Sequence, residues 1–154
     1  MLGLVPRLPG TDGGAKMSKS LGNCIYLGDP PETVRKRVMS MFTDPTRIHP
    51  TDPGHVEGNP VFTYHDVFNA NKSEVDELKD RYRKGTVGDV EVKQRLYDAL
   101  EEFLTPIRER RSHYGNNPKQ VYEIIRAGTH QGRGVAQATM EEVREVMKIA
   151  YKFE

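Results

Sequence analysis

The sequence has very little of what marks secreted or membrane-bound proteins. It contains a single cysteine, Cys24, so no intrachain disulfide can form, which suits a reducing compartment. No apolar run approaches the roughly 20 residues of a membrane-spanning helix, and the residues at the start lack the pattern of a secretory signal. These absences predict a soluble, cytoplasmic protein that does not enter a membrane.

Excess charge and tryptophan are also missing. Lys and Arg number 23 and Asp and Glu number 22, giving a net charge of +1, so a nucleic-acid partner would have to bind a local basic patch. With 36% hydrophobic residues in 154, the chain can bury a modest core in one domain. Its histidines His49, His55 and His65 are scattered and have no cysteine partners, so we expect no metal site.

What is present, from Asp29 onward, is the spacing of helices. Asp29 is a suitable N-cap, and Pro30 suits the first position of the helix that follows. Asn59 before Pro60 repeats this signal, and Ser73 is expected to cap a further helix. Apolar residues then recur at steps of three and four almost to the end of the chain. The predicted fold is mainly α, a bundle of four to five helices.

Two interruptions fall within these helical stretches. Pro106 lies inside an apolar stripe that runs from Val92 to Ile107, which predicts a kink there or a break one turn earlier. Glycines in the last stripe, among them Gly128 and Gly132, weaken a helix, so we expect a neighbouring helix to approach them closely. The alternative is a hinge or a backbone contact to a ligand.

The start of the chain has a different character. The stretch "GTDGGAKMSKSLGN" is rich in glycine and places two lysines, Lys16 and Lys19, three residues apart. Ammonium groups on flexible stems bind phosphate oxygens as point charges, and the nearby glycines would let such a loop close over a ligand. On composition alone, a solvated surface turn is the ordinary interpretation.

The order of several blocks separates these two interpretations. "KMSKS" resembles the second signature of class I aminoacyl-tRNA synthetases. The wider pattern is similar to bacterial-type tryptophanyl-tRNA synthetases over nearly the whole chain, through the blocks "TDGGAKMSKSLGNCIYL", "VRKRVMSMFTDP", "DPGHVEGNPVFTY" and "LEEFLTPIRERR".

This resemblance implies an activity and assigns residues to it. Such enzymes activate tryptophan with ATP and transfer it to tRNA(Trp). Lys16 and Lys19 would be the catalytic residues that grip the triphosphate, and the ATP-binding KMSKS loop (Lys16–Ser20) would also include Met17, Ser18 and Ser20. ATP, with Mg²⁺, belongs to the full-length enzyme, and we expect this chain alone to bind neither tightly.

One departure from the family limits what the chain can do. The earlier signature, similar to His-Ile-Gly-His, does not precede Lys16, and no alternating strand–helix stretch could form a nucleotide-binding sheet. The resemblance therefore predicts the C-terminal portion of a synthetase, inactive alone. Residues 1–28 would be the KMSKS segment with a remnant of the Rossmann domain, and residues 29–154 the anticodon-binding domain. The full-length enzyme would be a homodimer and this chain a monomer. The alternative is a free-standing helical RNA-binding module with a vestigial loop.

Contacts to tRNA are expected at the densest basic run, "PIRERRSHYGNNPK". Arginine binds phosphate and stacks on splayed bases, as tyrosine also does. The predicted contacts are Arg108, Arg110, Arg111, Tyr114 and Lys119. The other interpretation is a solvated helix end whose cations lie favourably at its negative C-terminus.

Two further basic groups have weaker claims. The first is the run from Arg35 to Arg37, with Arg47 further on. The second is Arg126, His130 and Arg133, which share one face of the last helix. For both, a solvated helix surface is the ordinary interpretation.

Overall fold

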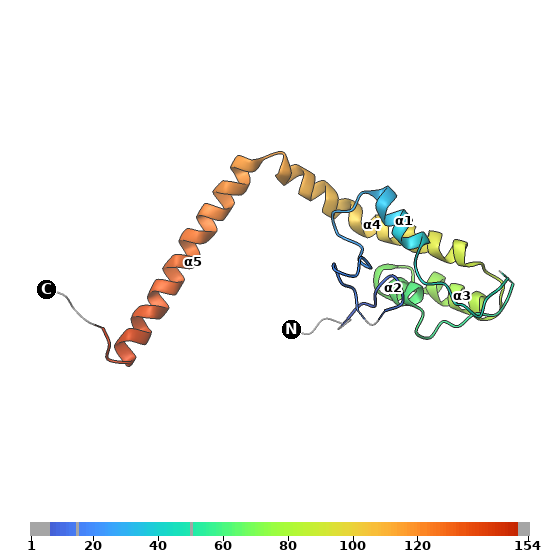
Figure 1. Ribbon diagram of the computed structural model, residues 1–154. Coiled ribbons are helices and arrows are strands. Elements are labelled where there is room, and N and C mark those ends of the chain that lie inside the picture. Colours follow the sequence, from blue (N-terminus) through green and yellow to red (C-terminus); the bar gives the residue numbers. More distant parts are fainter. Residues whose placement is uncertain (1–6, 15, 50, 151–154) are drawn as a thin grey trace. The chain divides into compact units, whose positions relative to one another are not determined.

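The computed structural model describes residues 7–14, 16–49 and 51–150. Within these residues there are five helices and no strand, which confirms the predicted mainly-α fold (Figure 1). The helices are α1 (Pro31–Met39), α2 (Pro60–Phe68), α3 (Lys72–Arg83), α4 (Asp89–Gly115) and α5 (Pro118–Val146).

The chain forms two compact units, Met1–Glu109 and Arg110–Glu154, and the division falls within α4. The first unit contains α1, α2, α3 and most of α4, and the second contains the end of α4 and α5. Side chains from before residue 28, including Met17 and Ile25, pack against the core of the first unit. The compact units therefore do not divide at residue 28, and the functional boundary predicted there stays a prediction.

The start of α1 differs from the prediction. Pro30 occupies the cap position in an extended conformation, and no side chain caps the helix, which begins at Pro31. Asp29 instead accepts a hydrogen bond from the Tyr26 N–H at 2.8 Å and pairs with Arg37 at 3.0 Å. Its carboxylate is thus used on the turn before the helix, and the predicted Asp29 cap is wrong.

The caps of α2 and α3 are both asparagines. As predicted, Asn59 caps α2, accepting a hydrogen bond from Val61 N–H at 3.0 Å. For α3 the predicted Ser73 is wrong, because the Asn71 side chain accepts from Glu74 N–H at 3.2 Å and the helix already begins at Lys72. Asparagine and serine cap equally well, so sequence alone could not rank these two neighbours.

Two expectations concerned interruptions of the helices. α4 continues past Pro106 to Gly115, so the predicted break is wrong. Pro106 is exposed, so the Glu102 carbonyl that loses its partner can be solvated. Around Gly128 and Gly132 of α5, no heavy atom of the described chain would lie within 4 Å of an added Cβ, outside the helix's own backbone. Within the described part of the second unit, therefore, no helix lies against these glycines.

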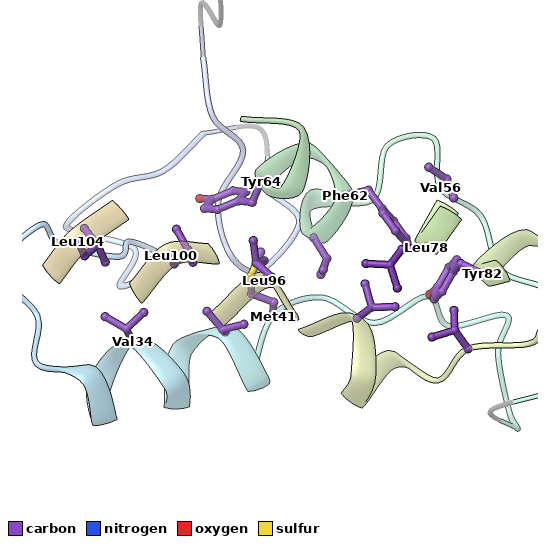
Figure 2. Packing of buried hydrophobic residues seen from close by; sticks show 14 residues of the cluster. Val34, Met41, Val56, Phe62, Tyr64, Leu78, Tyr82, Leu96, Leu100 and Leu104 are labelled. Atoms are coloured by element: carbon purple, nitrogen blue, oxygen red, sulfur yellow. The ribbon is translucent and has the colours of Figure 1, made fainter. Parts of the chain in front are cut away.

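The core of the first unit lies along one face of α4. Leu96, Leu100 and Leu104, spaced four residues apart, are each no more than 2% exposed. Figure 2 shows these leucines facing Val34 of α1, with Tyr64 and Phe62 of α2 beside them. Each fully buried leucine contributes roughly 1.5–3 kcal/mol relative to an exposed one, so this row carries much of the unit's stability.

A buried lysine joins α4 to the end of α1. Lys93 Nζ donates to the Met41 carbonyl at 2.7 Å, to the Met39 carbonyl at 3.2 Å and to Thr43 Oγ1 at 2.8 Å. These oxygens lie on the last residue of α1 and on the residues just after it, where positive charge is favourable. Burial lowers the pKa of Lys93, and the three acceptors compensate for the lost hydration.

A buried arginine pins the long loop between α1 and α2. The Arg47 guanidinium donates to the Val87 carbonyl at 2.7 Å, pairs with Asp89 at 3.1 Å and lies 4.1 Å from the centre of the Tyr82 ring. Its side chain is 1% exposed, so the expectation that Arg47 extends a surface basic patch is wrong. The Arg47 guanidinium instead holds in place the Pro- and Gly-rich loop to which it belongs.

Candidate functional site

The KMSKS loop presents its lysines to solvent and holds its methionine against the protein. The side chains of Lys16 and Lys19 are exposed, whereas Met17 is half-buried and packs against the core. The Met17 N–H donates to the Leu8 carbonyl at 3.4 Å. Because Met17 anchors the loop between the two lysines, both ammonium groups extend from a supported backbone.

The turn that follows the lysines needs a glycine. The Gly22 N–H donates to the Lys19 carbonyl at 3.2 Å, and Gly22 has a φ of +69°, which L side chains rarely adopt. At the start of this turn, the hydroxyls of Ser18 and Ser20 lie 2.9 Å apart on either side of Lys19 in the sequence. The loop therefore supplies two ammonium groups and two hydroxyls, the donor types that bind phosphate oxygens.

The base of the loop is bonded to the helical core. The Tyr64 hydroxyl donates to the Pro9 carbonyl at 2.8 Å, and the Phe42 N–H donates to the Thr11 carbonyl at 2.9 Å. Burial raises the pKa of Tyr64 to about 12, so its hydroxyl remains a donor at neutral pH. The core thus fixes where the loop begins.

Sequence reasoning missed two hydrogen-bonded polar side chains next to the loop, the exposed Asp12 and the buried Asn23. Asn23 is 4% exposed, and its side-chain amide hydrogen-bonds both Asp12 and the KMSKS loop itself. The available signal was an asparagine directly after a turn glycine, and it gave no indication of burial.

The predicted tRNA contacts do not lie in equivalent surroundings. Arg108, in the first unit, pairs with Glu101 and donates to the Asp29 carbonyl at 3.1 Å and to Thr105 Oγ1 at 3.0 Å. The hydrogen bond to Glu101 raises the pKa of Arg108. This guanidinium therefore already joins α4 to the turn before α1, and it is the predicted contact least available to a phosphate.

The remaining four predicted contacts are exposed and belong to the second unit. In the described part of the chain, neither Arg110 nor Arg111 has an ion-pair partner. Tyr114 is 44% exposed and meets His113 edge to face with ring centres 5.2 Å apart, and Lys119 lies in the first turn of α5. These side chains can reach a partner without breaking a contact of the fold.

The structure brings together the basic residues that were predicted to share one face of the last helix. Arg126, His130 and Arg133 line a hollow of about 380 Å³ on α5, along with Tyr122, Ile125 and Thr129. An aromatic ring and guanidinium groups around one hollow are suited to stacking on bases and binding phosphates.

The described residues contain neither a candidate metal site nor a helix that could span a membrane. No group of three or more His, Cys, Asp and Glu side chains gathers there as a possible ligand set. Among the helices described, none combines the length and apolar character needed to cross a bilayer.

Comparison with known proteins assigns the chain to a family. The family described as tRNA synthetases class I (W and Y) matches residues 3–105, about two-thirds of the sequence. The chain belongs to this family.

The similar proteins are tryptophan–tRNA ligases. The chain is 49% identical to the one from Clostridium longisporum over 97% of its own length and 52% identical to the one from Treponema pallidum over 93%. It resembles the crystal structure of Campylobacter jejuni tryptophanyl-tRNA synthetase complexed with ADP and tryptophan, with a TM-score of 0.79, 31% identity and 94% of this chain covered. The resemblance noted in the sequence blocks is confirmed.

The chain spans less than half of these relatives. The match covers 44% of the Clostridium longisporum protein, 42% of the Treponema pallidum protein and 44% of the Campylobacter jejuni chain. The remainder of each relative has no counterpart in these 154 residues.

Proposed function

We propose that this chain is the C-terminal portion of a tryptophan–tRNA ligase. It supplies the ATP-phosphate-binding KMSKS loop and the helical tRNA-binding part, and the complete enzyme activates tryptophan with ATP and transfers it to tRNA(Trp). The observation that carries the proposal is the pair of exposed lysines, Lys16 and Lys19, on a loop whose base is bonded to the core.

The chemistry of the loop follows from its donors. In nucleotidyl transfer the protein contributes mainly positioning and stabilisation of charge on the phosphates. Lys16 and Lys19 neutralise the triphosphate and the leaving pyrophosphate, and Ser18 and Ser20 add hydroxyl donors. Mg²⁺ accompanies ATP in the complete enzyme, where the part not spanned here selects tryptophan.

The experiment joins this chain in frame to the part of the Clostridium longisporum relative that it does not span. The joined enzyme is expected to catalyse tryptophan-dependent exchange of pyrophosphate into ATP, whereas the 154-residue chain alone is inactive. A folded joined enzyme without exchange would contradict the proposal and would favour the alternative, a free-standing RNA-binding module.

The tRNA-binding role concerns the second unit above all. Binding of this chain to tRNA(Trp) and to a control tRNA is compared across a salt titration. We expect a preference for tRNA(Trp) that fades in a variant with both Arg110→Ala and Arg111→Ala. Equal binding to both tRNAs with a steep salt slope would reduce the interaction to counterion release and contradict a specific role.

The assembly state is part of the same proposal. We propose a homodimer for the complete enzyme and a monomer for this chain. Sedimentation equilibrium of the chain and of the joined enzyme tests both, and a dimer of the chain alone would contradict the second.

A further inference from the structure

We propose that Asn23 is a positioning residue of the KMSKS loop, which it holds open for phosphate together with Asp12 and Gly10. This inference rests on the proposed function, because it concerns how the loop comes to present Lys16 and Lys19.

The side-chain amide of Asn23 bonds the backbone on both sides of Met17. Its Oδ1 accepts from the Ser18 N–H at 2.7 Å, and its Nδ2 donates to the Lys16 carbonyl at 3.2 Å. The lysines themselves are exposed, so their positions depend on the backbone from which they extend. One buried side chain thus fixes that backbone between the two cations.

Asp12 determines which way the Asn23 amide points. Asp12 Oδ1 accepts from Asn23 Nδ2 at 3.0 Å and also from the Gly14 N–H at 2.9 Å. These hydrogen bonds lower the pKa of Asp12, so it is an acceptor at neutral pH. Since Nδ2 must face this carboxylate, Oδ1 is turned toward Ser18. The backbone carbonyl of Asn23 also accepts from the Thr11 N–H at 3.1 Å, so Asn23 is bonded to the segment before the loop through its backbone as well.

Gly10 leaves the space in which this network sits. A methyl group added there would lie well inside contact distance of Asn23 Nδ2 and Asp12 Oδ1. Gly10 is buried, so an added methyl group could not turn away into solvent. A substitution at Gly10 therefore displaces the side chains of Asn23 and Asp12 without removing any of the groups that form their hydrogen bonds.

An unfixed loop would spread its lysines over many conformations. A phosphate ligand would then have to order the loop on binding, and the affinity would fall by that cost. The expected signature is weaker phosphate binding, although both lysines are present and the helical core is intact.

The test uses the full 154-residue chain and inorganic tripolyphosphate as the probe, followed by amide NMR. Asn23→Ala is expected to weaken tripolyphosphate binding roughly tenfold and to speed hydrogen exchange at the Ser18 amide. Gly10→Ala should produce the same two changes. Wild-type affinity in Asn23→Ala would overturn the inference.

The matched control is Asn59→Ala, because Asn59 is also 4% exposed and also accepts a backbone N–H, but at the start of α2. It should lower the thermal midpoint at least as much as Asn23→Ala and leave tripolyphosphate binding unchanged. If both variants weaken binding equally, Asn23 acts only through stability and the inference fails.

Exchanging the side chains of Asn23 and Asp12 distinguishes an effect on the position of the loop from an effect on folding alone. Asn23→Asp alone places two carboxylates together, whereas Asn23→Asp combined with Asp12→Asn restores a hydrogen bond between them in the opposite direction. The double variant should therefore bind tripolyphosphate more tightly than the Asn23→Asp single variant. No recovery would overturn the proposed pairing.

Lysine variants distinguish failure of this inference from failure of the proposed function. Lys16→Ala and Lys19→Ala should each weaken tripolyphosphate binding. If they do and Asn23→Ala does not, only the positioning role fails. If the lysine variants bind as the wild type does, the phosphate-binding function itself fails, and the positioning role with it.

Discussion

The first unit buries most of its apolar side chains in a shared core, whereas no described side chain of the second unit is buried. α4 has five buried residues, all of them in the first unit, while α5 has none, although its apolar and polar residues are more clearly separated around the helix. Ile125 and Val135 of α5 are 60% and 65% exposed. Amphipathic spacing thus predicts that a helix forms and which face is apolar, but burial depends on other elements being there to cover that face.

The largest expected effect is at the buried cation of the first unit. Arg47→Ala leaves Asp89 without its ion-pair partner and removes the donor to the Val87 carbonyl, so unfolding should become easier by about 3–5 kcal/mol. Denaturant unfolding measures the change. Arg111→Ala, an exposed arginine of the second unit, is the control and should stay within about 0.5 kcal/mol. Equal effects would mean that the contrast in burial does not govern stability.

A smaller loss of stability is expected when a buried aliphatic side chain of the first unit is truncated. Truncating an exposed isomeric side chain of the second unit should have almost no effect. Leu96→Ala empties a fully buried position and should destabilise by about 2–4 kcal/mol. Ile125→Ala removes a side chain that is already mostly exposed and should change stability by less than about 0.5 kcal/mol. A comparable loss at Ile125 would show that the apolar face of α5 is covered in solution.

The buried histidine gives the first unit a pH dependence. His65 Nε2–H donates to the Val92 carbonyl at 3.0 Å, and burial lowers its pKa below the ordinary 6.5. As the pH falls through about 6.5, the unfolded state takes up this proton first, so stability is lost on acidification until the folded pKa is reached.

His65→Gln should remove this dependence between pH 7 and pH 5, measured by urea unfolding at several pH values. His130→Gln, on exposed α5, is the matched control and should leave the dependence as it is. A slope that survives in His65→Gln would assign the dependence to another group.

The smallest effect is expected from removing α5. A chain that ends at Asn117 loses no buried side chain of the described helix, so its unfolding free energy should change by less than about 0.5 kcal/mol. Circular dichroism at 222 nm during denaturation would measure it. A large loss would contradict the assignment of the core to the first unit alone.

The sequence predicted the fold well because helical signals are local. Periodic apolar residues and the Asn59–Pro60 start each act within one helix, and the structure has them as expected. The errors at Asp29 and Ser73 arose where a neighbouring side chain competed for the same role, with Arg37 engaging Asp29 and Asn71 capping in place of Ser73.

The candidate site was predictable only in part. The resemblance of the KMSKS block pointed to Lys16 and Lys19, and the structure leaves both exposed. The roles of Asn23 and Arg47 were not predictable, because each depends on groups brought together by the fold. Arg47 meets Asp89 across 42 residues, and no local pattern marks such a pair.

We propose that the two units serve different steps of the reaction, and a comparison of those steps tests this division most directly. In the joined enzyme, Lys19→Ala should slow pyrophosphate exchange on the order of 100-fold. Arg110→Ala with Arg111→Ala should leave exchange unchanged and raise the KM for tRNA(Trp) in aminoacylation. If Lys19→Ala left exchange intact, or if the arginine variant slowed exchange as much as the lysine variant, the division of roles between the units would be contradicted.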